Sequence, residues 1–237
     1  MNYVRVYLSG DPVHDAVLRA FYDGCDASKA LVQGFEYRPS DIAVIFGVYK
    51  SRVPQSFARG KIFSQQRSNN LDVIVLETGY INRGDGKNHH YAAGFNGLNG
   101  RADFKAAQMP DDRAKLLAIE LKPWRKRGEH IVLCGQVPWD ASVDHHDHIA
   151  WLKDTITELR QRTKRRIVFR PHPLAKLPPF DGCEYSTDAL PSDLVDAHAV
   201  VTFNSNSGVE ATILGVPTIC TDEGSMIWDI ASHTVNE

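Results

Sequence analysis

The sequence predicts an α/β protein with two domains, each built on a parallel sheet. Short runs rich in valine and isoleucine alternate with longer segments of helical periodicity, which is the pattern of repeated β-α-β units. This pattern stops at a basic, proline-containing segment and then starts again. The chain has 237 residues, enough for two small domains. We therefore expect a first domain over 1–121, a linker over 122–128 and a second domain over 129–237.

The first half contains three apolar runs that predict buried strands and two amphipathic segments that predict helices. The strands are expected over Val4–Gly10, Asp41–Gly47 and Leu71–Tyr80, and the helices over Pro12–Tyr22 and Ser56–Arg67. The following segment, 81–101, is rich in glycine, asparagine and histidine and has no hydrophobic period. We expect it to be a long loop, and such loops are usually functional or mobile. A short helix is expected over 111–120.

The second half repeats the pattern of the first. In parallel sheets, ligands bind at the carboxyl ends of the strands. Polar residues cluster at several predicted strand ends here, and this coincidence predicts a binding site. Strands are expected over 130–136, 166–173, 199–208 and 216–222, with helices over 147–163, 190–197 and 209–214.

One cluster lies in the segment FNSNSGVEA, Phe203–Ala211, where an apolar strand stops at small polar residues. The first amides of the helix that follows lack intrahelical partners and carry a partial positive charge, which attracts phosphates. Ordinary helix capping is the alternative, but capping needs only one such residue. We therefore favour phosphate or ribose binding. The predicted donor-binding residues of this turn are Asn204, Ser205, Asn206, Ser207, Gly208 and Glu210.

A second cluster is the segment RPHP, Arg170–Pro173, at the end of another predicted strand. The two prolines stiffen the chain and fix the direction of Arg170 and His172. A guanidinium and an imidazole that face one crevice suit a diphosphate. The alternative is a strand end whose histidine is satisfied by a backbone carbonyl.

Together the two clusters resemble a known family. R-P-H-P, followed about thirty residues later by S-x-S-G-x-E-A-x-x-x-G-x-P, is similar to the C-terminal half of glycosyltransferases with two Rossmann-like domains. The similarity is greatest to the bacterial capsule-polysaccharide group, which includes Kdo transferases, and extends to related phage-encoded transferases. It covers about 100 residues, from about 130 to 225.

The resemblance implies a fold and a set of site residues. It implies two Rossmann-like parallel-sheet domains that face each other across a cleft, in a compact or truncated form, because the group's chains are longer. In that group the His-Pro segment and the Ser/Glu turn bind the donor nucleotide, which implicates His172, Ser205, Ser207 and Glu210. A glutamine followed by an aspartate after the first strand of the domain is matched by Gln136 and Asp140.

The expected function is transfer of a sugar from a nucleotide-sugar to an acceptor hydroxyl, with a UDP- or CMP-sugar as co-substrate and no further cofactor. A glycan, a small molecule and a modified DNA base all remain open as acceptors. Two competing interpretations also stay open. One is a sugar-nucleotide epimerase of the same architecture, and the other is a non-catalytic nucleotide- or DNA-binding protein.

An acceptor hydroxyl needs a carboxylate or histidine to take its proton. Glu77 at a predicted strand end is one candidate, and Asp140 and His172 in the second domain are further catalytic candidates. The acceptor-side residues that we expect in the first domain are His14, Tyr80, His89 and Asp103.

The segment DHHDH, Asp144–His148, carries residue types that bind metals, and His145 and His148 lie one helical turn apart. No second ligand cluster is evident in the sequence. We expect a polar loop and a helix N-cap here, and no metal.

The bulk properties describe an ordinary globular chain. The formal net charge of −2 gives no overall basic field, so a nucleic-acid partner would need a local patch. Basic residues gather in two segments, 122–127 and 160–166, which we interpret as solvated helix ends. The four cysteines form no C-x-x-C pair, and we see neither a signal peptide nor an apolar run that could cross a bilayer. We expect a reduced, cytoplasmic protein with no transmembrane segment.

Overall fold

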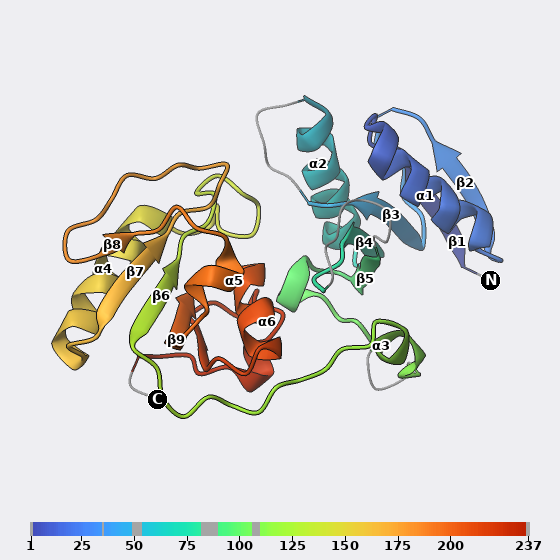
Figure 1. Cartoon of the computed structure of the whole chain (residues 1–237). Helices are drawn as coiled ribbons and strands as arrows, with labels where there is room; N and C mark the ends of the chain where they lie inside the picture. Colours follow the sequence, from blue (N-terminus) through green and yellow to red (C-terminus); the bar gives the residue numbers. More distant parts are fainter. Residues whose placement is uncertain (1, 35, 49–53, 82–89, 106–109, 236–237) are drawn as a thin grey trace. The chain divides into compact units, whose positions relative to one another are not determined.

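The computed structural model describes residues 2–34, 36–48, 54–81, 90–105 and 110–235. The chain forms two compact units, Met1–Met109 and Pro110–Glu237. Each unit contains one five-stranded sheet with helices packed on it (Figure 1). The expected fold class, α/β with two mainly parallel sheets, is therefore confirmed. Residues 110–121, which the sequence assigned to the first domain, are part of the second unit.

The first sheet has the strand order β2-β1-β3-β4-β5. Its first four strands are parallel, and β5 runs antiparallel to β4 at the edge. The strands are β1 Tyr3–Tyr7, β2 Ser28–Val32, β3 Ile42–Phe46, β4 Asp72–Thr78 and β5 Tyr91–Phe95. The other elements described in this unit are α1 Pro12–Gly24, α2 Pro54–Ser68 and the 3-10 turn η1 Asn99–Arg101.

Alternating side chains of these strands bury both faces of the sheet under helices. On one face, Leu18 of α1 packs against Val6 and Val44. On the other face, Ile62 of α2 packs against Ile45. Helix α1 begins after Asp11, whose carboxylate accepts hydrogen bonds from two first-turn amides and so satisfies donors that lack intrahelical partners.

The three expected strands of this half are confirmed, and two strands were missed. Strand β2 is an edge strand of intermediate burial, so its sequence is not a continuous apolar run. Lys29 within it donates to the carbonyls of Tyr22 and Cys25. The expectation of a structureless segment over 81–101 was wrong for its described part, because β5 and η1 lie there. The sequence of β5, Tyr-Ala-Ala-Gly-Phe, lacks the alternation of apolar and polar residues that marks a strand. It is a strand because it pairs with β4. Residues 82–89 lie outside the described residues.

The second sheet is parallel throughout, in the order β10-β9-β6-β7-β8. Its strands are β6 His130–Cys134, β7 Arg166–Arg170, β8 Glu184–Tyr185, β9 Ala197–Thr202 and β10 Thr218–Cys220. The helices are α3 Asp112–Leu116, α4 His148–Arg162, α5 Leu190–Asp193 and α6 Asn206–Ile213, followed by the 3-10 turn η3 Trp228–Ile230.

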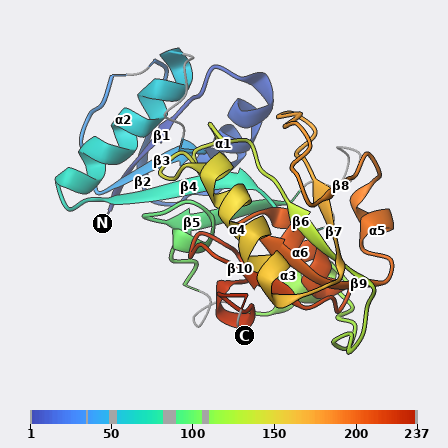
Figure 2. The same ribbon diagram turned by 90° about the vertical axis from the view of Figure 1, so that its left-hand side faces the viewer.

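Strand β6 lies at the centre of this sheet, and all five of its residues are buried. Helix α4 covers one face through Leu152, Ile156 and Leu159, whereas α5 and α6 cover the other (Figures 1 and 2; α4 is the helix of this unit nearest the viewer in Figure 2). All four cysteines are free thiols. Burial raises the pKa of Cys134 to about 12, as expected for a thiol that serves as a small core residue. None of the helices in the described residues is both long and apolar enough to cross a membrane.

Both sheets contain a point where the strand order reverses. From β1 the chain goes first to β2 on one side and later to β3 on the other. In the second unit it goes from β6 to β7 on one side and later to β9 on the other. Loops that leave two such neighbouring strands diverge to opposite faces, which leaves a crevice where ligands bind in open parallel sheets. The carboxyl ends of β6 and β9 therefore mark the place to look for a site.

Candidate active site

The strand ends of the second sheet are in register. Cys134 at the end of β6 lies opposite both Arg170 of β7 and Thr202 of β9, and Cys220 of β10 also lies opposite Thr202. The polar residues that follow these strands consequently meet at one edge of the sheet. They are Gln136 after β6, His172 after β7, Asn204 after β9 and Asp222 after β10.

Two buried amides join the strands on either side of the crevice. Gln136 Nε2 donates to Asn204 Oδ1 at 2.7 Å, and the Asn204 backbone N–H donates to Gln136 Oε1 at 3.0 Å. Asn204 Nδ2 also donates to the Ser142 carbonyl at 2.8 Å and to Asp222 Oδ1 at 2.7 Å. Both side chains were predicted to bind the donor. The structure places them at the predicted edge of the sheet, where their polar atoms join the loops after β6, β9 and β10.

The turn into α6 provides the wall of the crevice. Ser205 caps the helix and accepts a hydrogen bond from the Ser207 backbone N–H at 3.2 Å. Ser207 Oγ lies 3.3 Å from Ser205 Oγ, and the Ser207 side chain also hydrogen-bonds the buried thiol of Cys134. The helix starts at Asn206, three residues before the position expected from the sequence. The polar run therefore forms the first turn of the helix and not a loop before it.

Glu210 and Asn206 lie on the same face of this helix. Asn206 Nδ2 donates to Glu210 Oε1 at 3.3 Å, and the Glu210 side chain is exposed. Asn206 Oδ1 is shielded from solvent and accepts no hydrogen bond from any described residue. An acceptor in this state is costly unless a donor reaches it. Of the predicted donor-binding residues of this turn, Glu210 thus presents an exposed carboxylate on α6.

Gly208 has a packing role that the sequence reasoning missed. A Cβ at this position would lie 3.2 Å from Ile227 Cδ1 and 3.2 Å from Thr202 Cγ2. The Gly208 N–H donates to the Ser205 carbonyl at 3.0 Å. The residue therefore lets α6 approach the sheet closely, and this approach brings the start of the helix to the ends of β6 and β9.

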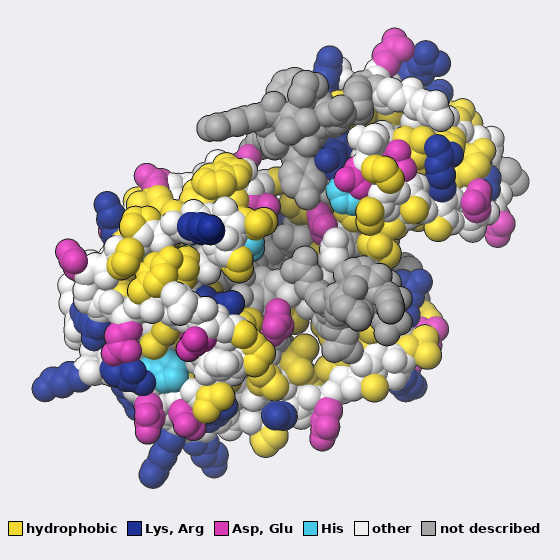
Figure 3. Space-filling model, turned by 45° about the horizontal axis from the view of Figure 1, so that its top comes forward, with side chains coloured by type: hydrophobic (Ala, Val, Ile, Leu, Met, Phe, Trp, Pro, Cys, Tyr) yellow, Lys and Arg dark blue, Asp and Glu magenta, His cyan; other side chains and the backbone are white. Residues whose placement is uncertain are grey.

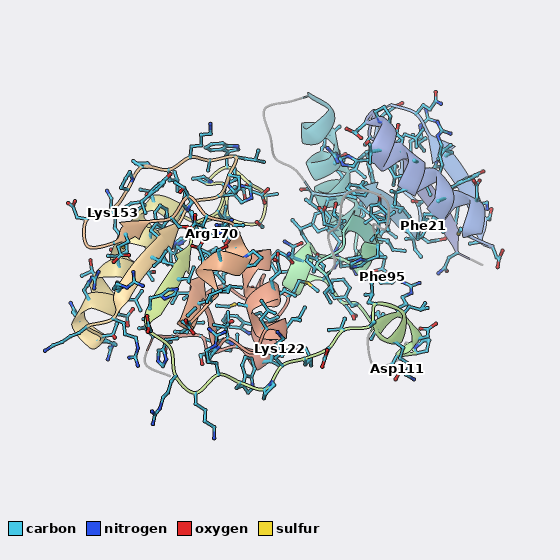
Figure 4. The ribbon with its side chains drawn as sticks, viewed as in Figure 1. Phe21, Phe95, Asp111, Lys122, Lys153 and Arg170 are labelled. Carbon is cyan, nitrogen blue, oxygen red and sulfur yellow. The ribbon has the colours of Figure 1, made fainter. Side chains whose placement is uncertain are left out.

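Arg170, predicted to bind a diphosphate, makes contacts within the protein (Figure 4). Its Nη1 donates to Asp193 Oδ2 at 2.8 Å and to the Asp188 carbonyl. Asp193 is buried and also accepts from Ser186 Oγ at 2.7 Å. The guanidinium thus anchors α5 next to the end of β7, and this buried partner was not evident from the sequence.

His172 lies at the end of β7 as predicted and is half-buried. Its Nδ1 accepts a hydrogen bond from the Leu174 backbone N–H at 3.2 Å. Its own carbonyl accepts from the Ala175 N–H at 2.9 Å. A ring whose Nδ1 is an acceptor carries its proton on Nε2, so the turn formed by RPHP selects the tautomer of this histidine.

Two aspartates between β6 and α4 hold the backbone of this segment. Asp140 Oδ1 accepts from both the backbone N–H of Ser142, at 2.9 Å, and its Oγ, at 2.7 Å, which is a structural role for a predicted catalytic carboxylate. Asp147 caps α4, which confirms the N-cap expected in DHHDH. Within the described residues, no group of three or more His, Cys, Asp or Glu side chains suits a metal ion.

Two histidines of DHHDH contact residues at this edge of the sheet, and the sequence did not single them out for it. His148 Nε2 accepts from the Gln136 backbone N–H at 2.9 Å, and burial lowers the pKa of His148 to about 4, so this ring is neutral. His145 Nε2 lies 3.1 Å from Asp222 Oδ2. Asp222 follows β10, the last strand of the sheet in the sequence. Its position after a strand end was the feature of the sequence that could have indicated a site residue.

In the first unit, two predicted residues lie at the carboxyl edge of the sheet. His14, in the first turn of α1, stacks on Phe46 at the end of β3 with ring centroids 4.1 Å apart. Phe46 lies opposite Leu76, the residue before Glu77. Burial lowers the pKa of His14, which favours the neutral imidazole. Glu77 is half-buried, and its Oε1 accepts from the Thr78 N–H at 2.8 Å.

The other predicted acceptor-side residues are not gathered with this pair. Asp103 pairs with Phe95, which lies opposite Ile74 on β4, three residues before Glu77 and so about 10 Å along the strand. Hydrogen bonds from Lys105 lower the pKa of Asp103. Tyr80 Oη donates to Asn99 Oδ1 at 2.8 Å. His89 lies outside the described residues.

The basic segments have structural partners of their own. Arg125 Nη1 donates to the carbonyls of Leu194 and Ala197, both at 2.8 Å, and Arg166 pairs with Glu184 at 2.8 Å. On the face drawn in Figure 3, the Lys and Arg side chains of the molecule are interspersed with Asp and Glu. These contacts favour the interpretation of the segments as solvated, structural charges.

Comparison with known proteins supports the fold. Two structures of KpsC from Thermosulfurimonas dismutans match the chain. One, a beta Kdo 2,7 transferase, has a TM-score of 0.56 and 17% identity over 92% of this chain and 77% of its own. The other, a beta Kdo 2,4 transferase, has a TM-score of 0.59 and 16% identity over 92% of this chain and 78% of its own. The expected resemblance to the capsule-polysaccharide and Kdo transferase group is thus confirmed at the level of the fold. No protein-family model and no curated protein matches the sequence.

Proposed function

We propose that the protein is a glycosyltransferase that binds a nucleotide-sugar at the carboxyl edge of its second sheet. The observation that carries the proposal is the crevice between β6 and β9, where the reversal of strand order coincides with the start of α6. Its floor is the Gln136–Asn204 pair, and its wall is the turn at Ser205. The likeness in fold to two Kdo transferases points to the same class of reaction.

The chemistry of the crevice suits a nucleotide. The start of α6 offers a partial positive charge to a phosphate. The exposed Glu210 carboxylate offers an acceptor to ribose hydroxyls. His172 supplies an Nε2–H at the neighbouring strand end. These groups of the protein would hold the donor, and a UDP- or CMP-sugar is the expected co-substrate.

The first unit would supply the acceptor side. His14 is a suitable general base because burial keeps its imidazole neutral, and Glu77 lies at the same edge of that sheet. In direct displacement, the acceptor oxygen forms a bond to the anomeric carbon while its proton passes to the base. The bond from that carbon to the phosphate oxygen breaks, and its electron pair leaves with the nucleotide.

A thermal-shift screen with UDP-, CMP-, GDP- and TDP-sugars tests the proposal. A ligand at a concentration one hundred times its Kd stabilises the folded state by about 2.7 kcal/mol, which is readily measured as a rise in Tm. We expect a rise with at least one UDP- or CMP-sugar, CMP-Kdo among those included. A flat response to all four classes would contradict donor binding.

The location of the donor is tested by Glu210→Ala, with Glu158→Gln on α4 as the matched control. Glu210 lies one turn into α6, whereas Glu158 lies on α4 and pairs with Arg162. We expect the thermal shift of Glu210→Ala to require about tenfold more donor, the effect of losing one or two hydrogen bonds. Equal donor requirements for the two variants would place the ribose elsewhere.

A further inference from the structure

A histidine-aspartate pair lies at the candidate donor crevice and has no part in the function proposed so far. His145 Nε2 is 3.1 Å from Asp222 Oδ2, and the two residues come from the loops after β6 and β10. The Asp222 side chain is 10% exposed and the His145 side chain 39% exposed. The carboxylate is thus held inside the protein while the imidazole reaches the surface.

The carboxylate is held rigidly. Asp222 Oδ1 accepts hydrogen bonds from Asn204 Nδ2 at 2.7 Å and from the Gly224 N–H at 2.9 Å, which leaves Oδ2 directed to His145. The ring of His145 also contacts Phe203, with centroids 5.7 Å apart. Phe203 and Asn204 directly follow β9, so these contacts fix His145 at the end of that strand.

We propose that His145, oriented by Asp222, binds a phosphate of the donor nucleotide and stabilises it as it leaves the sugar; this inference rests on the proposed function. A protonated imidazole donates from both ring nitrogens, one to Asp222 and the other to a phosphate oxygen. The positive end of α6 and the imidazolium would then both stabilise the phosphate. His145 is the residue in direct contact with the ligand, and Asp222 is its positioning residue.

The charge that develops during the transfer explains why a His145–Asp222 pair would help the reaction. When the bond between the anomeric carbon and the phosphate oxygen breaks, the electron pair remains on the phosphate, and its negative charge grows in the transition state. A fixed cation next to this oxygen stabilises the transition state more than the bound donor. The buried Asp222 carboxylate keeps the cation in place, as the aspartate does for the histidine in hydrolase triads. The other titratable residues nearby in sequence are Asp144, His146 and Glu223.

The experiment compares the affinity for UDP and CMP with the affinity for uridine and cytidine, which lack the phosphate. The variants are His145→Gln, His145→Lys and Asp222→Asn, and the matched control is His146→Phe. His146 is the next residue in the chain and stacks on Phe203, a contact that phenylalanine retains. Binding is measured by calorimetry for nucleotides and by competition with millimolar nucleoside at pH 6.5.

We expect His145→Gln to weaken nucleotide binding about ten- to a hundredfold, the effect of losing one charge-assisted hydrogen bond, and to leave nucleoside binding unchanged. His145→Lys should recover part of the loss because it restores the charge. Asp222→Asn retains the Oδ1 acceptor for Asn204 and should weaken nucleotide binding less than His145→Gln. His146→Phe should bind like the wild-type protein.

Two results would overturn the inference. The first is wild-type nucleotide affinity in His145→Gln. The second is a proportional loss of nucleotide and nucleoside binding that lysine does not recover, which would make His145 a structural residue. Failure of the proposed function is a different outcome, because there the wild-type protein itself binds neither UDP nor CMP.

Discussion

At the scale of single residues, the buried polar groups of the second unit are matched to one another. The Gln136 and Asn204 side chains are 7% and 6% exposed, and each satisfies the other through two hydrogen bonds. A buried amide left without its partner costs more than the hydrogen bond gains, because it cannot return to water. Removing either side chain therefore strands polar atoms of its partner.

We predict that Gln136→Ala lowers the free energy of unfolding by about 2 kcal/mol, since Asn204 loses one donor and one acceptor. Urea unfolding followed by circular dichroism gives the value. Gln161→Ala, at an exposed position of α4, is the control and should change stability by less than about 0.5 kcal/mol. Equal effects for the two variants would show that the amide pair does not stabilise the site.

His148 predicts a dependence of stability on pH. Burial lowers the pKa of His148 to about 4 from 6.5, so between these values the unfolded chain binds a proton that the folded chain does not. The contribution of the neutral, buried His148 to the free energy of unfolding is fully present above pH 6.5. It is lost as the pH falls toward 4, by about 3 kcal/mol in all. We expect His148→Gln, which keeps an acceptor for the Gln136 N–H, to lose less stability over this range in urea titrations. Parallel curves for the two proteins would contradict the assignment.

The sequence predicted some site residues and not others for a physical reason. Ser205 follows a local rule, because a small polar residue before a helix caps it, and the structure confirms the cap. Arg170 and His145 have partners 23 and 77 positions away in the chain. A partner at that distance is set by the topology of the sheet, which a single sequence does not specify residue by residue.

At the scale of elements, the position of α6 depends on the absence of a side chain at Gly208. The helix packs on β9 and β10 at a distance that leaves 3.2 Å between a hypothetical Cβ and two neighbouring methyl carbons. A larger residue would have to move the helix or its neighbours. Since the start of this helix forms the wall of the candidate site, its packing and the geometry of the crevice are coupled.

We predict that Gly208→Ala lowers stability by about 1 kcal/mol, since overpacking outweighs the better helix propensity of alanine. Gly24→Ala at the end of α1 is the matched control, because a Cβ there meets nothing within 4 Å and should stabilise the protein slightly. Opposite signs in thermal unfolding support the argument. A stabilising Gly208→Ala would show that the helix has room to move.

Elements with a strong hydrophobic pattern were predicted from the sequence, and short edge elements were not. The central strands β3, β6 and β9 are almost wholly buried, β4 is buried from Val73 to Leu76, and each is an apolar run in the sequence. Strand β8 has two exposed residues and exists through its pairing with β7. Pairing along an edge depends on backbone hydrogen bonds, which every residue but proline can make, so composition carries little information about it.

At the scale of the whole molecule, each unit has cores of its own. The clusters around Leu133 and Val200 contain residues of the second unit alone, and those around Val6 and Ile45 belong to the first. The basic segment expected as a linker is bonded to the second unit: the Lys122 N–H donates to the Ile213 carbonyl at 3.0 Å (Figure 4).

We predict that a fragment of residues 110–237 folds by itself and binds the same nucleotide as the full chain. A fragment of 129–237 should be less stable, because it loses the bonds of Lys122 and Arg125 to the end of α6 and to the start of β9. Circular dichroism melting and thermal shift with nucleotide compare the two. Equal stability of the fragments would mean that residues 110–128 are dispensable for the fold.

The hydrogen bonds between Gln136 and Asn204 also predict how these two positions vary among relatives. The Asn204 side chain gives its acceptor to Gln136 and its donor to Ser142 and Asp222, so a change that removes Asn204 Oδ1 leaves Gln136 Nε2 without this partner. Relatives with this crevice should therefore exchange the two residues together, as a covarying pair separated by 68 positions. Such a pair would mark the strand reversal at β6 and β9 in sequences too divergent to align by eye.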